Sequence, residues 1–325
     1  MAHDSALLQL SRQAVRRICR RSGSNFTRSF LMLPAPKREA MEALYAFARV
    51  TDDLGDGPHP ISVRSRWLDW WRQTAALNLL DSQELVFPDR LSISPSDEGD
   101  DPVRHLRKHA REILPALAAS ARQFEIPSRY LLEIIDGVSA DQQKTRFDTY
   151  EQVEHYCYLV ASAVGLACLY VWGFDELPET AAIDCGLGFQ WTNILRDIRE
   201  DAGRGRIYLP RQHYEKHGLA EDDLLRPRVD DRLTCLIEEQ CSRAADLYDS
   251  GWGVFEQLHP DGQRMFSMMW RTYRRLLSMV EADPSAVLRG RIGLTQGQKF
   301  QLAFTHTIPL LFRRLPVPPV EVKAS

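Results

Sequence analysis

Two pairs of aspartates, far apart in the sequence, have the spacing that most clearly indicates chemistry. Asp52 and Asp56 end one helical pattern, and Asp197 and Asp201 end another. On an α-helix, residues i and i+4 project from the same face, so each pair directs two carboxylates toward one region. Carboxylates this close repel one another and stay ionised only where a cation neutralises them. Since Mg²⁺ prefers oxygen ligands and also binds phosphates, the spacing predicts a magnesium site for a phosphate-bearing ligand.

Each pair belongs to a longer polar stripe. Gln190 and Asn193 precede the second pair at positions i and i+3 of the same helical face. Tyr45 and Arg49 precede the first pair in a similar way, and a guanidinium suits diphosphate oxygens because it donates two parallel hydrogen bonds. A single acidic pair near a helix end is more often a cap or a solvated charge. Two such stripes on otherwise apolar helices favour a binding site.

The rest of the sequence predicts the helices that would position these stripes. Apolar residues at helical spacing predict an all-α protein, and neither alternating strand patterns nor a glycine-rich phosphate loop after a strand is found. If the two acidic clusters share one site, residues 1–325 form a single domain. The turn-rich segment 81–102 is predicted to be an exposed loop, and the proline-rich tail from Pro309 to be loosely held. The predicted helices cover 36–53, 61–80, 103–124, 129–138, 150–172, 179–199, 230–258 and 262–282.

Composition narrows the class of protein and its location. The chain has 325 residues, a formal net charge of −3 and a pI near 6.3, which argues against a nucleic-acid partner. Its six cysteines lack CxxC spacing, and the arginine-rich segment Met1 to Arg21 lacks the apolar region of a signal peptide. We therefore expect a reducing, cytoplasmic location. The uncharged run Tyr156 to Phe174 is interpreted as a buried helix rather than a membrane span, because no Lys or Arg flanks it.

Four segments together resemble a known family, the squalene/phytoene synthases. They read YAFARVTDDLGD at 45–56, YCYLVASAVG at 156–165, QWTNILRDIRED at 190–201 and GRIYLP at 205–210. The resemblance covers about residues 22 to 302 and implies a class I isoprenoid-synthase helical bundle around a central cavity. Two departures are the sequence SGSNF at 22–26, where the family often has more serines, and Gly55, which we expect to loosen the end of its helix.

The resemblance also implies residue roles. The implied magnesium ligands are Asp52, Asp56, Asn193, Asp197 and Asp201. The implied catalytic residues are Tyr45, Arg49, Tyr156, Gln190, Arg206 and Tyr208, and the implied substrate-binding residues are Phe26, Phe30, Asp53, Asp141 and Glu200. Phe26, Phe30, Tyr45, Tyr156 and Phe189 are expected to line a dry pocket whose aromatic faces stabilise a carbocation.

The implied activity is a magnesium-dependent, head-to-head condensation of two prenyl diphosphates. The run at 193–201 favours enzymes that convert farnesyl diphosphate to presqualene diphosphate or squalene for hopanoid or sterol precursors. The alternative is a phytoene synthase that uses geranylgeranyl diphosphate, and a hydroxysqualene synthase is less favoured. Manganese is the alternative metal, and NADPH is a candidate cofactor if the reaction proceeds to squalene. The apolar product implies transient contact with the inner membrane face and with other isoprenoid-pathway enzymes.

Two rival functions fit the residues less well. A non-catalytic family member that acts in assembly would typically have lost acidic ligands, and here both aspartates of each pair are present. A metalloprotease would need HExxH, whereas His213 and His217 flank the sequence Tyr-Glu-Lys. We interpret these histidines as an exposed helix start after Pro210.

Overall fold

The computed structural model describes residues 2–22, 25–79, 85–87 and 102–293. The predicted loop at 81–102 lies almost entirely outside these residues, as does the predicted tail. Within them the fold is all-α, as predicted, and the only strand-like pairing is an isolated antiparallel bridge between Phe174 and Leu258. The longer helices are α1 (Ala2–Arg21), α3 (Ala35–Asp56), α4 (Ile61–Leu79), α5 (Pro102–Gln123), α6 (Ser128–Gln143), α7 (Tyr150–Cys157), α8 (Ala163–Trp172), α9 (Glu179–Gly203), α12 (Asp231–Gly251) and α14 (Pro260–Ala282).

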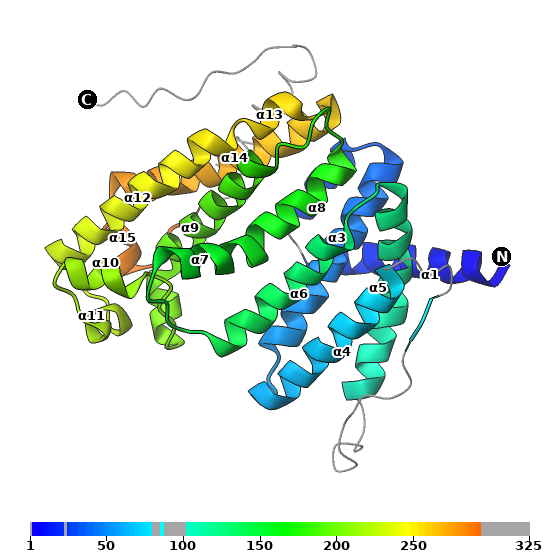
Figure 1. Cartoon of the computed structure of the whole chain (residues 1–325), viewed down its shortest axis with the longest axis horizontal. Coiled ribbons are helices and arrows are strands. Elements are labelled where there is room, and N and C mark those ends of the chain that lie inside the picture. Colours follow the sequence, from blue (N-terminus) through cyan, green and yellow to red (C-terminus); the bar gives the residue numbers. More distant parts are fainter. Residues whose placement is uncertain (1, 23–24, 80–84, 88–101, 294–325) are drawn as a thin grey trace.

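Short helices complete the chain. They are α2 (Asn25–Ser29), a 3₁₀ turn (Phe30–Met32), α10 (Arg211–Lys216), α11 (Glu221–Leu225), α13 (Val254–Gln257) and α15 (Ala286–Arg289). Figure 1 shows α6 and α8 running between α3, α4 and α5 on one side and α9, α12 and α14 on the other. This arrangement lets α3 and α9, which carry the two acidic stripes, approach the middle of the bundle from opposite sides.

Two predicted helix boundaries need correction, and one helix was not predicted. The helix predicted at 129–138 continues to Gln143, which brings Asp141 onto α6. The helix predicted at 230–258 ends at Gly251, because the chain turns at Trp252 and Gly253 before α13. The N-terminal segment, for which no helix was predicted, forms α1. Its last turn carries arginines, which are favourable at the negative end of a helix dipole.

The central apolar helix contains an irregular turn. A π-helical turn, Tyr158–Ser162, joins α7 to α8, and such turns often occur near functional sites. The combined stretch Tyr150–Trp172 is long and apolar enough to cross a membrane, with a mean hydropathy of 1.4, but 61% of its apolar window is buried within the fold. This burial fits the prediction of a core helix.

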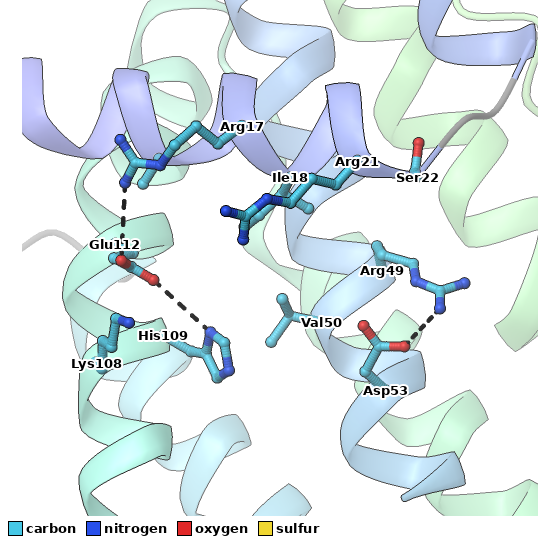
Figure 2. Close-up of a pocket in the computed structure, with 11 residues that line it drawn as sticks. Arg17, Ile18, Arg21, Ser22, Arg49, Val50, Asp53, Lys108, His109 and Glu112 are labelled. Atoms are coloured by element: carbon cyan, nitrogen blue, oxygen red, sulfur yellow. Dashed lines mark ion pairs between the residues drawn. The ribbon is translucent and has the colours of Figure 1, made fainter.

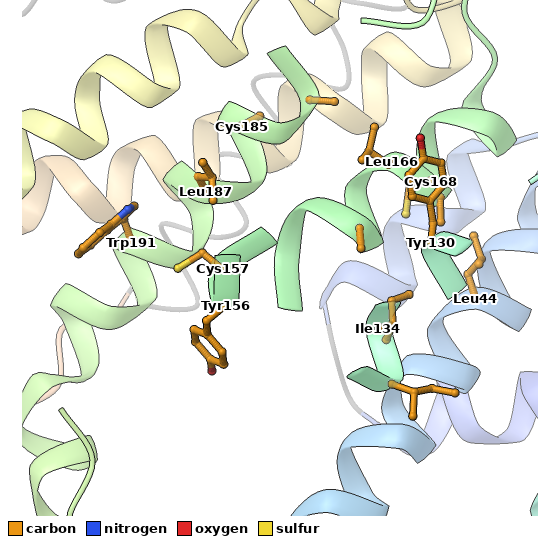
Figure 3. Close-up of a cluster of buried hydrophobic side chains, with 14 of the residues drawn as sticks. Leu44, Tyr130, Ile134, Tyr156, Cys157, Leu166, Cys168, Cys185, Leu187 and Trp191 are labelled. Atoms are coloured by element: carbon orange, nitrogen blue, oxygen red, sulfur yellow. The ribbon is translucent and has the colours of Figure 1, made fainter. Parts of the chain in front are cut away.

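The buried core lies between these helices and determines how closely they pack. Gly55 was expected to loosen the end of α3, but α3 continues through it to Asp56. A Cβ atom added at Gly55 would lie 2.3 Å from Val138 Cγ1, so the glycine permits close contact between α3 and α6. Figure 3 shows buried side chains that tie the bundle together, from α3 (Leu44), α6 (Tyr130, Ile134), α7 (Tyr156, Cys157), α8 (Leu166, Cys168) and α9 (Cys185, Leu187, Trp191).

Candidate active site

The first acidic stripe lies at the C-terminal end of α3. Its carboxylate Asp52 is accessible to solvent, yet surrounding protein desolvates it and, together with the charge of Asp56, raises its pKa to about 6. Its carboxyl group is therefore protonated more readily than that of a solvated aspartate, and a cation bound beside it would favour the ionised form.

The second stripe runs along α9, as predicted. Asn193 Nδ2 donates a hydrogen bond to Gln190 Oε1 over 3.2 Å. Burial, followed by the charge of Asp197, raises the pKa of Asp201 to about 6. The two stripes thus share one electrostatic property, an aspartate with a raised pKa, which is the first of the pair on α3 and the second of the pair on α9.

Asp197 differs from Asp201 because two arginines hold it. Arg196 Nε lies 2.9 Å from Asp197 Oδ1, and Arg291 Nε lies 3.0 Å from the same oxygen. Arg291 also reaches Glu200, with Nη1 3.4 Å from Oε2, and Glu200 pairs further with Arg204 at 2.9 Å. The sequence reasoning missed Arg196 and Arg291. Arg196 directly precedes Asp197 and does not share its helical face, so the spacing did not indicate a contact. Arg291 lies far from Asp197 in the sequence.

Asp141 connects the remaining predicted residues into one network. Its Oδ1 accepts hydrogen bonds from the hydroxyls of Tyr156, at 3.0 Å, and Tyr208, and its Oδ2 lies 2.8 Å from Arg206 Nη1. The rings of Tyr156 and Tyr208 are stacked with centroids 5.1 Å apart, and Phe147 packs against both. Burial and the Asp141 charge raise the pKa of both phenols, so they remain protonated donors at neutral pH.

The network lies between the two acidic stripes. The charge of Asp141 contributes to the raised pKa of Asp52 on α3 and of Asp201 on α9. Arg206, in the loop after α9, is also close enough to Asp56 for that charge to raise its pKa. Charges from both stripes therefore act on the network formed by Asp141 and Arg206, and a single shared site stays a prediction.

The predicted aromatic residues divide among three clusters. Phe26, Phe30 and Tyr45 form one, with Phe26 and Phe30 centroids 4.8 Å apart and each 6.3 Å from Tyr45. Tyr156 belongs to the stack on Asp141, whereas Phe189 stacks on Tyr273 at 4.6 Å. In the part of the chain that is described, these rings do not form one continuous wall.

Arg49 and Asp53 lie at the margin of the site. Arg49 Nη2 is 2.7 Å from Asp53 Oδ1, and both side chains are about half exposed, at 51% and 55%. Both line a basic pocket between α1, α3 and α5 (Figure 2). The structure thus directs Asp53 away from the neighbouring Asp52, whose charge interacts with Asp141.

The donor set fits magnesium in chemistry. Among the described residues, no three His, Cys, Asp or Glu side chains converge closely enough to hold a metal ion. The side chains on the two stripes are nevertheless oxygen donors, which Mg²⁺ prefers. Desolvation, followed by the charge of the paired aspartate, raises the pKa of Asp52 and of Asp201, and a bound cation would offset both effects by stabilising the ionised carboxylates. The residues therefore suit a cation that arrives together with an anionic ligand.

The two histidines after Pro210 belong to a separate cluster. His213 Nδ1 lies 3.2 Å from Glu239 Oε1, and His217 Nε2 lies 2.8 Å from Glu239 Oε2. Helix α10 begins just after Pro210, as predicted, although both rings are partly covered. Both histidines therefore pair with one glutamate on α12, a structural contact that does not need a protease metal site.

Comparison with known proteins decides the family. Residues 19–298 match the model of the squalene/phytoene synthase family. The chain belongs to this family. Similar curated relatives include the phytoene synthase of Mycobacterium tuberculosis, 31% identical over 290 residues that cover 88% of this chain and 87% of the relative. The 15-cis-phytoene synthase of Synechocystis is 29% identical over 84% of this chain and 79% of the relative.

Solved structures of this family have the same fold. A dehydrosqualene synthase bound to a ligand superposes with a TM-score of 0.72 and 23% identity, covering 94% of this chain and 98% of that one. A squalene synthase from Alicyclobacillus acidocaldarius also gives 0.72 and 23%, covering 88% and 97%. At 23% identity these superpositions establish the all-helical fold. They do not identify the substrate.

Proposed function

We propose that this protein is a prenyltransferase that joins two geranylgeranyl diphosphates head to head to give phytoene. The observation that carries the proposal is the 31% identity over 88% of the chain to a phytoene synthase, together with an acidic stripe on each of α3 and α9. The sequence-based preference was for farnesyl diphosphate and a squalene-type product. The curated relatives favour the alternative that the sequence left open.

The residues around Asp141 supply the polar half of the chemistry. Magnesium, typical of this family, would be held by Asp52, Asp56, Asn193, Asp197 and Asp201 and would neutralise the diphosphate as its allylic C–O bond breaks. Arg206 can donate to diphosphate oxygens through its guanidinium fork. The phenols of Tyr156 and Tyr208 remain protonated and donate their hydrogens to Asp141, so they position this carboxylate and cannot act as bases.

The aromatic cluster supplies the apolar half. Phe30 is 1% exposed and packs behind Phe26 and Tyr45, which are partly exposed, so the three rings form a rigid aromatic wall near the start of the first stripe. Aromatic faces attract a cation through their quadrupole and do not react with it as nucleophiles. Exclusion of water around these rings would protect an allylic cation from hydrolysis until the second prenyl chain reacts.

Use of farnesyl diphosphate is the second candidate. It is favoured by the same cluster, because Phe26 and Phe30 pack edge to face and would limit the length of an adjacent chain. Purified protein should be incubated separately with each diphosphate and magnesium, with and without NADPH, and the products identified by mass spectrometry. Phytoene from the C20 donor supports the proposal. Presqualene diphosphate or squalene from the C15 donor alone would replace it with the second candidate.

A further inference from the structure

The segment that follows α14 lies against the second acidic stripe. Helix α15 packs on α9, and its side chains Val287 and Leu288 are buried in the core. Two residues beyond α15, Arg291 Nε lies 3.0 Å from Asp197 Oδ1, and its Nη1 lies 3.4 Å from Glu200 Oε2. A cation that belongs to the chain itself therefore lies beside an implied magnesium ligand.

Arg199 on α9 holds the end of this segment. Its Nη1 donates hydrogen bonds to the backbone carbonyl oxygens of Leu288, at 3.3 Å, and Arg289, at 2.7 Å. The last carbonyls of a helix have no partner within the helix, so a guanidinium satisfies them and interacts favourably with the negative end of the helix dipole. Because Arg199 and Asp197 lie on the same helix, this contact determines where Arg291 lies relative to Asp197.

Asp197 differs in its ion pairs from the other aspartates of the two stripes. Arg196 binds it through Nε at 2.9 Å and Nη2 at 2.5 Å, and both of these side chains are 16% exposed. Among the described residues, no lysine or arginine lies within ion-pair distance of the other three, Asp52, Asp56 and Asp201. The second arginine at Asp197 is 59% exposed, so it can leave the carboxylate and remain solvated.

We propose that Arg291, positioned by Arg199, is an internal cation that competes with magnesium for Asp197 until an anionic ligand binds. A guanidinium 3.0 Å from a carboxylate oxygen repels a divalent cation that approaches the same oxygen. An anionic ligand gives the exposed guanidinium another partner and frees the carboxylate for the metal. Metal and anion should therefore each strengthen the binding of the other. This inference rests on the magnesium site of the proposed function.

The test measures Mn²⁺ binding to the full chain in the absence of any diphosphate, by electron paramagnetic resonance of the free ion. Manganese is the probe because carboxylate oxygens suit it as they suit magnesium. Arg291→Ala should bind Mn²⁺ about three- to fivefold more tightly than the wild type, because a competing charge is removed. Arg199→Ala should also tighten binding, and Arg199→Lys, which keeps a charged donor for the carbonyls, should restore the wild-type affinity. The matched control is Arg275→Ala, which removes an exposed arginine of α14 and should change the affinity less than about twofold.

Two double variants assign the effect to these residues. Arg199→Ala should add nothing in the Arg291→Ala background, because both residues act through one contact, and an additional gain there would show that Arg199 does not act through Arg291. Asp197→Asn combined with Arg291→Ala should lose the gain, and a gain that persists would overturn the proposal because the metal would then lie elsewhere.

Equal or weaker Mn²⁺ binding by Arg291→Ala, including no measurable binding by either protein, would also overturn the proposal. A variant that merely damages the fold would bind metal more weakly, whereas a gain is predicted, and circular dichroism verifies folding. These measurements use no prenyl substrate and no turnover. Their failure is therefore distinct from failure of the proposed function, which is judged by the products formed.

Discussion

Arg206 Nη1 lies 2.8 Å from Asp141 Oδ2, and this ion pair fastens the loop after α9 to the end of α6. Both side chains are about four-fifths covered, at 21% and 19% exposure, so the pair is shielded from solvent more than a surface pair is. Through it the loop that follows the second acidic stripe is held against α6. The relationship joins two segments far apart in the sequence at the centre of the candidate site.

Asp141→Asn should damage both stability and activity. The substitution removes the charge that Arg206 faces, and we expect a loss of about 1–3 kcal/mol of unfolding free energy. Turnover should fall about 10- to 100-fold, because Tyr156, Tyr208 and Arg206 lose their common anchor. The control is Asp136→Asn on the same helix, whose partner Arg72 is 45% exposed, and it should leave turnover near that of the wild type. Normal turnover in Asp141→Asn would show that the network is dispensable.

Asp52→Asn should stabilise the metal-free protein while it reduces activity. The pKa of Asp52 is raised in the fold to about 6, so the folded state binds more protons than the unfolded state between about pH 4 and 6. This residue therefore makes the wild type less stable as pH rises through that window. At pH 7 without metal, we expect the variant to melt about 1–3 °C higher in calorimetry.

The control for this effect is Asp53→Asn. Asp53 pairs with Arg49, so the substitution should leave the melting temperature unchanged or lower it slightly. A lower melting temperature for Asp52→Asn at pH 7 would contradict the view that its carboxylate is crowded. Turnover is measured separately from melting temperature. For Asp52→Asn we expect turnover to fall although the melting temperature rises, because Asp52 is an implied metal ligand.

Arg291→Ala should impair the second stripe. Arg291 contacts Asp197 and Glu200, so its guanidinium lies where an anionic ligand of that stripe would bind. We expect kcat/KM to fall about tenfold, which corresponds to the loss of one charge-assisted contact. Arg289→Ala is the matched control, because Arg289 pairs with Asp283 instead. Equal kinetics for the two variants would remove Arg291 from the site.

Phe26→Ala should shift the chain-length preference. Phe26 is partly exposed, whereas Phe30 is a core residue whose truncation would cost about 3–5 kcal/mol of stability. Removing the outer ring should raise the ratio of geranylgeranyl to farnesyl diphosphate turnover about tenfold, if the ring limits the chain. Competition assays with both donors measure this ratio. Phe174→Ala, a partly buried ring packed on Tyr170 instead, should leave it unchanged.

Sequence periodicity predicted the helices and the two stripes well, because Asp52 and Asp197 both lie on strongly patterned amphipathic segments. It ended α6 too early, since the residues from Ser139 to Gln143 are mostly polar and show no apolar period. It also misinterpreted Gly55, whose role depends on Val138, a contact that helix propensity cannot reveal. Long-range partners such as Arg291 follow from tertiary packing alone.

We propose that the two acidic stripes act together as one magnesium-dependent diphosphate site. The most direct measurement is a double-mutant cycle on magnesium-dependent pyrophosphate release, with Asp56→Asn, Asp201→Asn and the combined variant. Each single variant should lose about a hundredfold or more in turnover, and the combined variant should be little worse than either, because residues that act as a unit are not additive. Chelator should abolish release by the wild type. Near-normal release by either single variant, or by the wild type in chelator, would contradict the claim.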